Sequence, residues 1–170
     1  MPGCANGSRK RSLRCARRVA ELIGWTAKPD LPVIEAAAAC AMLHSFYTKV
    51  EKILKMIALD LDQEVSPSES WHRDLLNQMT RATASRPAVI TPELRTSLGE
   101  LLAFRHLFRG ASIAIMRWNK LAPLVAKVPT AHQETVSQLQ KFRHARCARS
   151  RILTNEFACS KMPGYLWNPA

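Results

Sequence analysis

The clearest structural signal in the chain is residues 46–61, which read FYTKVEKILKMIALDL. The apolar side chains recur at steps of three and four residues, the spacing of one face of an α-helix. They are Phe46, Val50, Ile53, Leu54, Ile57 and Leu61. Pro32 suits the first position of this helix, because its φ is already fixed and it has no N–H to satisfy. We therefore predict one amphipathic helix from Pro32 to about Asp62.

Helix signals continue after this segment, and strand signals are scarce. Ser68 or Ser70 can cap a shorter helix that runs from Trp71 to about Thr83. The triplet Thr91-Pro92-Glu93 predicts the start of a second long helix. It combines a hydroxyl cap, a proline at the first position and an acid near the positive end of the helix dipole.

The last third of the chain contains two helix-breaking residues. Pro123 and Pro129 bracket a short helical piece that begins at about residue 117. Thr130 and Gln133 form a capping box, which predicts a separate last helix. Four main helices with short connections indicate an all-α protein, an up-and-down four-helix bundle with an additional short helix.

The composition excludes several classes of protein. Hydrophobic residues make up 47% of the 170 residues, which is enough for one core. The longest apolar run, residues 36–43, is far shorter than the roughly 20 residues of a membrane span. No secretory signal follows the basic N-terminus, so we expect a cytoplasmic protein with no membrane segment. The five cysteines are widely spaced and no glycine-rich phosphate loop is present, so we expect neither a metal nor a cofactor.

Nearly all of the net charge of +12 lies at the two ends of the chain. Residues 1–28 and 141–170 together carry thirteen Lys and Arg but only two Glu. Basic arms on a neutral body suit a polyanion, since each cation placed on a phosphate releases counterions. Solvated tails with no specific partner would show the same pattern. We divide the chain into a partly helical basic arm (1–30), a helical bundle (31–144) and a basic tail (145–170).

One arginine stands at an inner position of the second long helix. The helical period that aligns Leu94, Leu98 and Leu101 also includes Arg105. A buried guanidinium without a partner is costly, so packing alone does not explain Arg105. Trp71 and His72, at the start of the shorter helix, are candidates for the lining of a cleft, although a core role is favoured for the tryptophan.

A series of short motifs stands in order between residues 31 and 143. They are His44-Ser45-Phe46-Tyr47, Val50-Glu51-Lys52-Ile53, Glu69-Ser70-Trp71-His72, Arg86-Pro87-Ala88-Val89-Ile90, Phe104-Arg105-His106-Leu107-Phe108-Arg109 and residues 121–128. Together these motifs resemble the HepT-like branch of the HEPN helical ribonucleases. The first 30 residues and those after about residue 145 take no part in the resemblance.

The resemblance implies a homodimeric HEPN bundle that cleaves RNA without a metal. In that family an Arg, a polar residue, three spacers and a His form the site at the dimer cleft. The His transfers protons and the Arg binds the phosphate. The resemblance also implies a toxin–antitoxin system, in which a small nucleotidyltransferase antitoxin is the partner and can modify a Tyr two residues past the His.

The chain departs from this motif over residues 110–116. Arg105 matches the arginine and His106 the polar residue, but Gly110 stands at the His position and Ser112 at the Tyr position. A glycine cannot transfer a proton. Either the site has decayed in a protein that keeps the fold, or a compensated pair of frameshifts has rewritten these residues.

Two functions therefore stay open. The first is an RNase toxin, in which Arg105 and, in place of the missing histidine, His106 are the catalytic candidates. The second is a catalytically inactive bundle that binds the antitoxin or RNA without cutting. In either case the candidate RNA-binding residues are Arg109, Arg117, Arg143 and Arg146.

Overall fold

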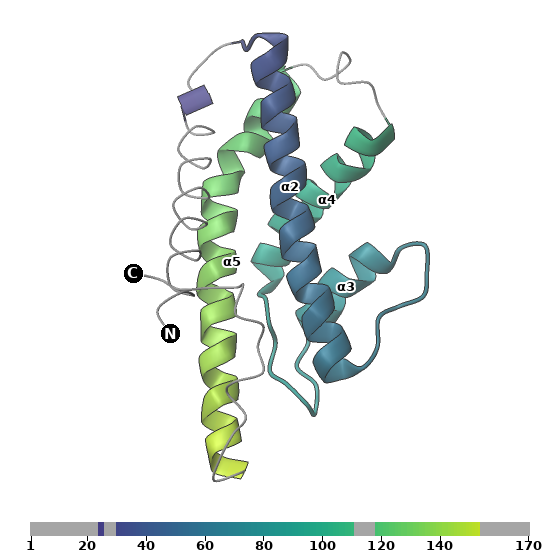
Figure 1. The fold of residues 1–170 in the computed structure, drawn as a ribbon, viewed down its shortest axis with the longest axis vertical. Helices are drawn as coiled ribbons and strands as arrows, with labels where there is room; N and C mark the ends of the chain where they lie inside the picture. The colour runs from purple at the N-terminus through teal and green to yellow at the C-terminus, as the bar shows by residue number, and fades with distance from the viewer. Residues whose placement is uncertain (1–23, 26–29, 111–117, 154–170) are drawn as a thin grey trace, which may run out of the picture.

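Four α-helices account for most of the residues that the structure describes (Figure 1). The computed structural model describes residues 24–25, 30–110 and 118–153, and these contain no strand. α2 spans Val33–Ile57, α3 spans Trp71–Met79, α4 spans Pro92–Gly110 and α5 spans Trp118–Leu153. The prediction of an all-α helical bundle is confirmed.

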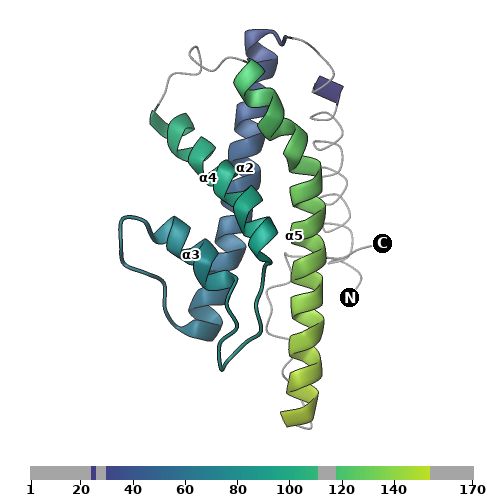
Figure 2. The same ribbon diagram turned by 180° about the vertical axis from the view of Figure 1, so that it is seen from behind.

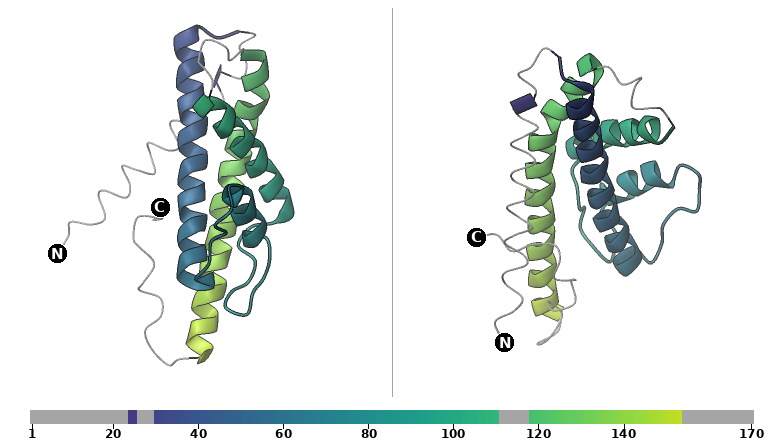
Figure 3. Two further views of the ribbon diagram at one scale, coloured as in Figure 1. Left: turned by 90° about the vertical axis from the view of Figure 1, so that its right-hand side faces the viewer. Right: turned by 45° about the horizontal axis from the view of Figure 1, so that its top comes forward.

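The two longest helices, α2 and α5, run in the same direction, and α4 runs the opposite way between their ends (Figures 1 and 2). α3 is short and packs against α2 and α4. Both views of Figure 3 show α2 and α5 extending along the length of the molecule. This arrangement turns the start of α3 and the end of α4 toward each other.

The apolar faces of the helices meet in one core. Leu43 and Leu54 of α2, Leu98 of α4 and Val125 of α5 are fully buried in it. Burial of each such side chain contributes roughly 1.5–3 kcal/mol. Cys40 is also fully buried there, and burial raises the pKa of its thiol. None of the described helices combines the length and the apolar character that a membrane crossing requires.

α2 begins directly after Pro32, and one wider helical turn follows its last residue, Ile57. This last turn is a π-helix, η1, which spans Ala58–Asp62, so the helix predicted over residues 32–62 is confirmed. The chain leaves η1 through Gln63 in the left-handed conformation, with φ of 56°. The turn ends with Asp62 in contact with Arg86, a residue of the loop between α3 and α4.

The predicted start of α4 is confirmed in detail. The Thr91 hydroxyl accepts a hydrogen bond from the Leu94 N–H at 3.3 Å, and Pro92 is the first helical residue. Hydrogen bonds from its own backbone and from Thr91 hold the pKa of the Glu93 carboxyl below its ordinary value. These signals are local, so the sequence alone identifies this helix end.

α3 ends at Met79, four residues before the predicted Thr83. The Met79 carbonyl accepts hydrogen bonds from the N–H groups of Val89 and Ile90, at 2.9 Å and 3.2 Å. The loop therefore folds back onto the end of the helix and stops it. Ser70 occupies the N-cap position, but its hydroxyl donates to Asp74 and does not cap the helix.

The predicted break in the last third of the chain is wrong. α5 is continuous through Pro123 and Pro129, so Thr130 is not a cap and the additional short helix is part of α5. The reason is tertiary packing, because Leu121, Val125 and Val128 are buried and hold the proline-containing turns on the core. Figure 2 shows that α5 bends in its N-terminal third, which contains both prolines.

Two observations concern the predicted division of the chain into a basic arm, a helical bundle and a basic tail. α5 continues to Leu153 and so extends past residue 144, where we placed the end of the bundle. Most of the basic arm lies outside the described residues, but Trp25 packs against the core. The boundaries at 30 and 144 stay predictions.

Replacing Pro123 with alanine is expected to stabilise the fold by about 1–3 kcal/mol and to raise Tm. Pro123 is exposed, and alanine would restore an N–H for the Asn119 carbonyl and remove the clash of the ring. Thermal unfolding followed by circular dichroism measures the change. Pro87→Ala, in a loop, is the matched control and should lose stability slightly, by about 0.4–1 kcal/mol. A lower Tm for Pro123→Ala would show that packing of α5 requires the bend.

Candidate functional site

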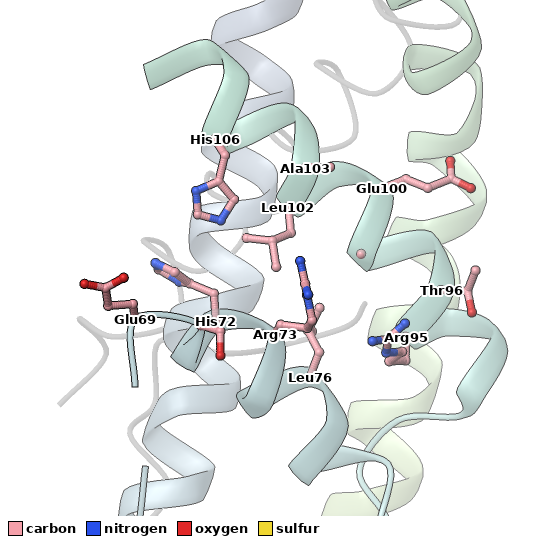
Figure 4. Close-up of a pocket in the computed structure, with 12 residues that line it drawn as sticks. Glu69, His72, Arg73, Leu76, Arg95, Thr96, Glu100, Leu102, Ala103 and His106 are labelled. Atoms are coloured by element: carbon pink, nitrogen blue, oxygen red, sulfur yellow. The ribbon is translucent and has the colours of Figure 1, made fainter. Parts of the chain in front are cut away.

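A pocket of about 370 Å³ lies between α3 and α4 (Figure 4). α4 leaves room for it because it presents Gly99 and Ala103 at this place. A Cβ added to Gly99 would meet only the Arg95 guanidinium, at 3.9 Å, so the space above the helix is open. The volume is within the range of about 300–1,000 Å³ that is typical of ligand pockets.

One end of this pocket is lined by two imidazoles. His72 lies in the first turn of α3 and His106 near the end of α4, and both line the pocket. The centroids of their rings are 5.5 Å apart and the rings meet edge to face. Figure 4 shows the two side chains next to each other.

Two arginines, Arg73 and Arg95, are among the other residues that line the pocket. The Arg95 Nε donates to the Asn77 Oδ1 at 2.9 Å, which orients the Arg95 guanidinium. Arg73 is exposed and points from α3 toward α4 (Figure 4). Two acids, Glu69 and Glu100, also line the pocket, but Glu100 is paired with Lys127 of α5. The charged side chains of the wall are therefore two arginines and two acids, of which Glu100 already has a cation partner outside the pocket.

A buried ionic cluster lies directly behind the imidazole end. It joins Glu51 of α2, His72 of α3 and Arg105 of α4. The Glu51 Oε1 accepts hydrogen bonds from the His72 Nδ1 and from the Arg105 Nη1, the latter at 2.9 Å. Glu51 is only 5% exposed and His72 9%. Glu51 thus supplies the partner that Arg105 needs at its inner position.

Aromatic rings enclose this cluster. Trp71 stacks on His72 with ring centroids 3.6 Å apart, and the Lys55 Nζ lies 4.8 Å above the Trp71 ring. The Arg105 guanidinium lies 5.9 Å from the centre of the Tyr47 ring. Burial, together with the negative charge of Glu51, raises the pKa of Tyr47 well above its ordinary value, so its hydroxyl keeps its proton.

Burial also governs the charge of His72. It lowers the pKa of the imidazole, and the neighbouring charges of Arg105 and His106 act in the same direction. The hydrogen bond and the charge of Glu51 oppose this shift but do not overcome it. His72 is therefore neutral near pH 7.

The structure brings only some of the predicted site residues together. Arg105 lies in the buried cluster and His106 lines the pocket. Arg143 and Arg146 are partly exposed on α5 and do not line the pocket. Arg109 belongs to the last turn of α4, where only the backbone is described, and Arg117 lies outside the described residues.

Sequence reasoning missed Glu51, Arg73 and Arg95, and it weighed His72 only as a candidate for a cleft. The sequence does contain a pattern that could have predicted the role of Glu51. It is an acid on the buried face of α2, between Tyr47 and Leu54, just as Arg105 is a base on the buried face of α4. Two opposite charges on inner faces predict a pair. Among the described residues, no three His, Cys, Asp or Glu side chains are grouped as metal ligands are.

The fold and this site define a class of protein, an α-helical bundle with a buried ionic cluster beside a pocket that two histidines and two arginines help to line. The chain belongs to the HepT-like family, because the sequence model of that family, described as "HepT-like protein", matches residues 38–146, more than half of the chain. The resemblance that the motifs indicated is thus confirmed. No curated protein and no solved structure gives a significant match.

Proposed function

We propose that this HEPN-type, toxin-like protein binds RNA in the pocket between α3 and α4 and cleaves it there. The observation that carries the proposal is that two imidazoles and two guanidiniums line one pocket. An imidazole can take the proton of a ribose 2′-hydroxyl, and a guanidinium binds phosphate oxygens. RNA offers both groups, whereas DNA lacks the hydroxyl.

The arginine end of the pocket is suited to hold the RNA backbone. Asn77 accepts from the Nε of Arg95, and within the described part of the chain no hydrogen bond is found at the two terminal nitrogens, which suit a phosphate. Because Arg95 is already oriented, less side-chain entropy is lost on binding. Arg73 adds a second cation on the facing helix.

An inactive bundle that binds RNA or an antitoxin without cutting is the second candidate. It is favoured by the position of Arg105, whose Nη1 is engaged by Glu51 within the chain, and by Gly110 at the position of the family's proton-transferring histidine. Cleavage distinguishes the two. A synthetic RNA and a DNA of the same sequence are incubated with the purified protein in the presence of a chelator. Cleavage of the RNA alone supports the metal-independent RNase, and binding of RNA that stays intact supports the inactive bundle.

Replacing Arg73 and Arg95 together with glutamine is expected to weaken RNA binding. If each arginine contacts one phosphate, the slope of log affinity against log salt should fall by about 1.4, since each contact on a single strand is worth about 0.7. Fluorescence anisotropy with a labelled RNA at several salt concentrations measures this slope. The control is Arg81→Gln with Lys120→Gln, two exposed cations outside the pocket. An unchanged slope in the pocket variant would place the RNA elsewhere.

A second variant tests the pocket without altering charge. Ala103→Leu fills the space above α4, and Ala103 is exposed on a helix that tolerates leucine well. RNA binding should weaken while the helical content stays the same.

The partners of this function are proposals that rest on the family. They are a nucleotidyltransferase antitoxin in a toxin–antitoxin system and a second copy of the chain in a homodimer. Glu51 of the same chain offsets the charge of Arg105, so the position of Arg105 does not by itself require a dimer.

A further inference from the structure

We propose that His72, held by Glu51, is the proton acceptor for RNA cleavage in the α3–α4 pocket, and that it takes the place of the histidine that α4 lacks at Gly110. This inference rests on the function proposed for the pocket. It assigns the chemistry to a residue of α3 and its positioning to a residue of α2, neither of which belongs to the α4 motif.

The hydrogen bond to Glu51 determines which ring nitrogen of His72 carries the proton. The His72 Nδ1 contacts the Glu51 Oε1 directly. If a neutral His72 carried its proton on Nε2, two lone pairs would face each other at this contact. The stable neutral form therefore has the proton on Nδ1, which donates to Glu51, and a lone pair on Nε2. A carboxylate orients a catalytic histidine in the same way in hydrolase triads.

The Nε2 lone pair of His72 is available for chemistry. The Arg105 Nη1 lies 3.1 Å from the His72 Nδ1 and 3.5 Å from the Nε2, and the second distance is beyond the ordinary hydrogen-bond range of about 2.7–3.2 Å. The short distance to Nδ1 fits two N–H donors that converge on the same Glu51 oxygen. The same Nη1 donates to Glu51 at 2.9 Å. The stacked Trp71 ring restricts rotation of the imidazole. A group that must accept a proton is thus oriented in advance, at the edge of a pocket where the substrate would bind.

The charged groups around His72 come from three helices. Glu51 is on α2, Arg73 on α3 and Arg105 and His106 on α4, while Glu69 precedes α3 and lines the same pocket. Burial keeps the pKa of His72 below its ordinary value, so the free-base form is present at neutral pH.

The proposed reaction moves the phosphorus from the 5′-oxygen of one nucleotide to the 2′-oxygen of the preceding ribose. The His72 Nε2 takes the proton of a ribose 2′-hydroxyl, and the 2′-oxygen forms a bond to phosphorus. The bond between phosphorus and the 5′-oxygen breaks, and the leaving oxygen takes a proton from the His106 imidazolium. The products are a 2′,3′-cyclic phosphate and a free 5′-hydroxyl, and proton exchange with solvent restores both histidines.

The first test is His72→Gln in the full-length protein. The rate of RNA cleavage should fall by about 100- to 10,000-fold, the usual contribution of a general base. The matched control is His144→Gln, an exposed histidine of α5 that does not line the pocket. In a His72→Ala variant, added free imidazole should restore part of the rate, and it should leave wild type unchanged. A purely structural His72 would not be rescued in this way.

The second test concerns Glu51, which orients His72 and also pairs with Arg105. Glu51→Gln should lower the rate of cleavage by about 10-fold or more, because an amide can donate to Nδ1 and favour the wrong tautomer. It should also move the acid limb of the pH profile of kcat/KM to lower pH, since the carboxylate favours the imidazolium. Glu64→Gln, on an exposed side chain, is the control.

Nitrogen NMR of the imidazoles in wild type provides a readout that does not depend on activity. We expect a protonated Nδ1 and an unprotonated Nε2 for His72 at neutral pH. The opposite tautomer would overturn the inference, and so would a His72→Gln variant that cleaves RNA like wild type. If wild type binds RNA but does not cut it, the proposed RNase function fails, and the role of His72 as proton acceptor fails with it.

Discussion

Replacing Arg86 with alanine is expected to destabilise the protein by about 3–5 kcal/mol, a large part of the total stability of a domain of this size. Arg86 is fully buried in the loop between α3 and α4 and is paired with Asp62 at the end of η1. Removing the guanidinium would leave the Asp62 carboxylate without its cation. Chemical denaturation followed by circular dichroism measures the loss.

All five N–H groups of Arg86 have acceptors in the fold. Its Nε and Nη2 donate to the Asp62 carboxylate, at 2.9 Å and 2.6 Å. The remaining donors bind the backbone carbonyls of Gln78, Arg81 and Pro87. Arg86 thus connects the end of η1, the end of α3 and the loop between α3 and α4. Loss of its side chain would remove all of these contacts at once.

A matched control and a pH series make the prediction specific. Arg81→Ala removes an exposed arginine from the same loop and should change stability by no more than about 0.5 kcal/mol. Burial alone would raise the pKa of the Asp62 carboxyl, but hydrogen bonds from Arg86 and Gln78 outweigh it and hold the pKa below its ordinary value. The stabilisation from Asp62 is then complete above about pH 4, near the unfolded pKa, and is lost as the pH falls further. An Arg86→Ala variant as stable as wild type would contradict the pairing.

Replacing Glu51 with alanine is the second change with a large expected effect, also about 3–5 kcal/mol. Its side chain is 7% exposed and compensates Arg105, which is 12% exposed. Without Glu51, the Arg105 Nη1 loses its carboxylate and a guanidinium is left buried without an opposite charge. Thermal and chemical unfolding should both show the loss.

Two further variants separate the buried charge from simple loss of volume. Glu51→Leu combined with Arg105→Met removes both charges, and it should recover most of the stability because apolar side chains replace an ion pair well. Glu64→Ala, at an exposed position, is the control and should have little effect. A double variant no more stable than Glu51→Ala would show that the cluster is not held by this pair.

Local sequence signals were sufficient for the elements that depend on neighbours along the chain. The period of residues 46–61 identified α2, and the triplet Thr91-Pro92-Glu93 identified the start of α4. In each case the groups that interact lie within one or two turns of each other. Contacts between residues that are close along the chain can be predicted from the sequence alone.

The elements that sequence reasoning got wrong depend on distant contacts. α3 stops at Met79 because Val89 and Ile90 bind its last carbonyl. α5 continues through Pro123 and Pro129 because its buried face packs on the core. In both cases packing outweighed a local preference worth a few kcal/mol.

The candidate site shows the same division. Sequence periodicity placed Arg105 on an inner face and so established that a buried cation needed a partner, and the motifs established the family. Only the tertiary structure identified that partner, because Glu51 lies 54 positions from Arg105 and His72 lies 33 positions from it. The strength of a charge pair depends on distance in space, and a helical period reports only which face a residue occupies. The sequence by itself therefore determined α2, the start of α4, the family and the inner position of Arg105. The packing of α2, α3 and α4 decided the buried cluster and the pocket beside it.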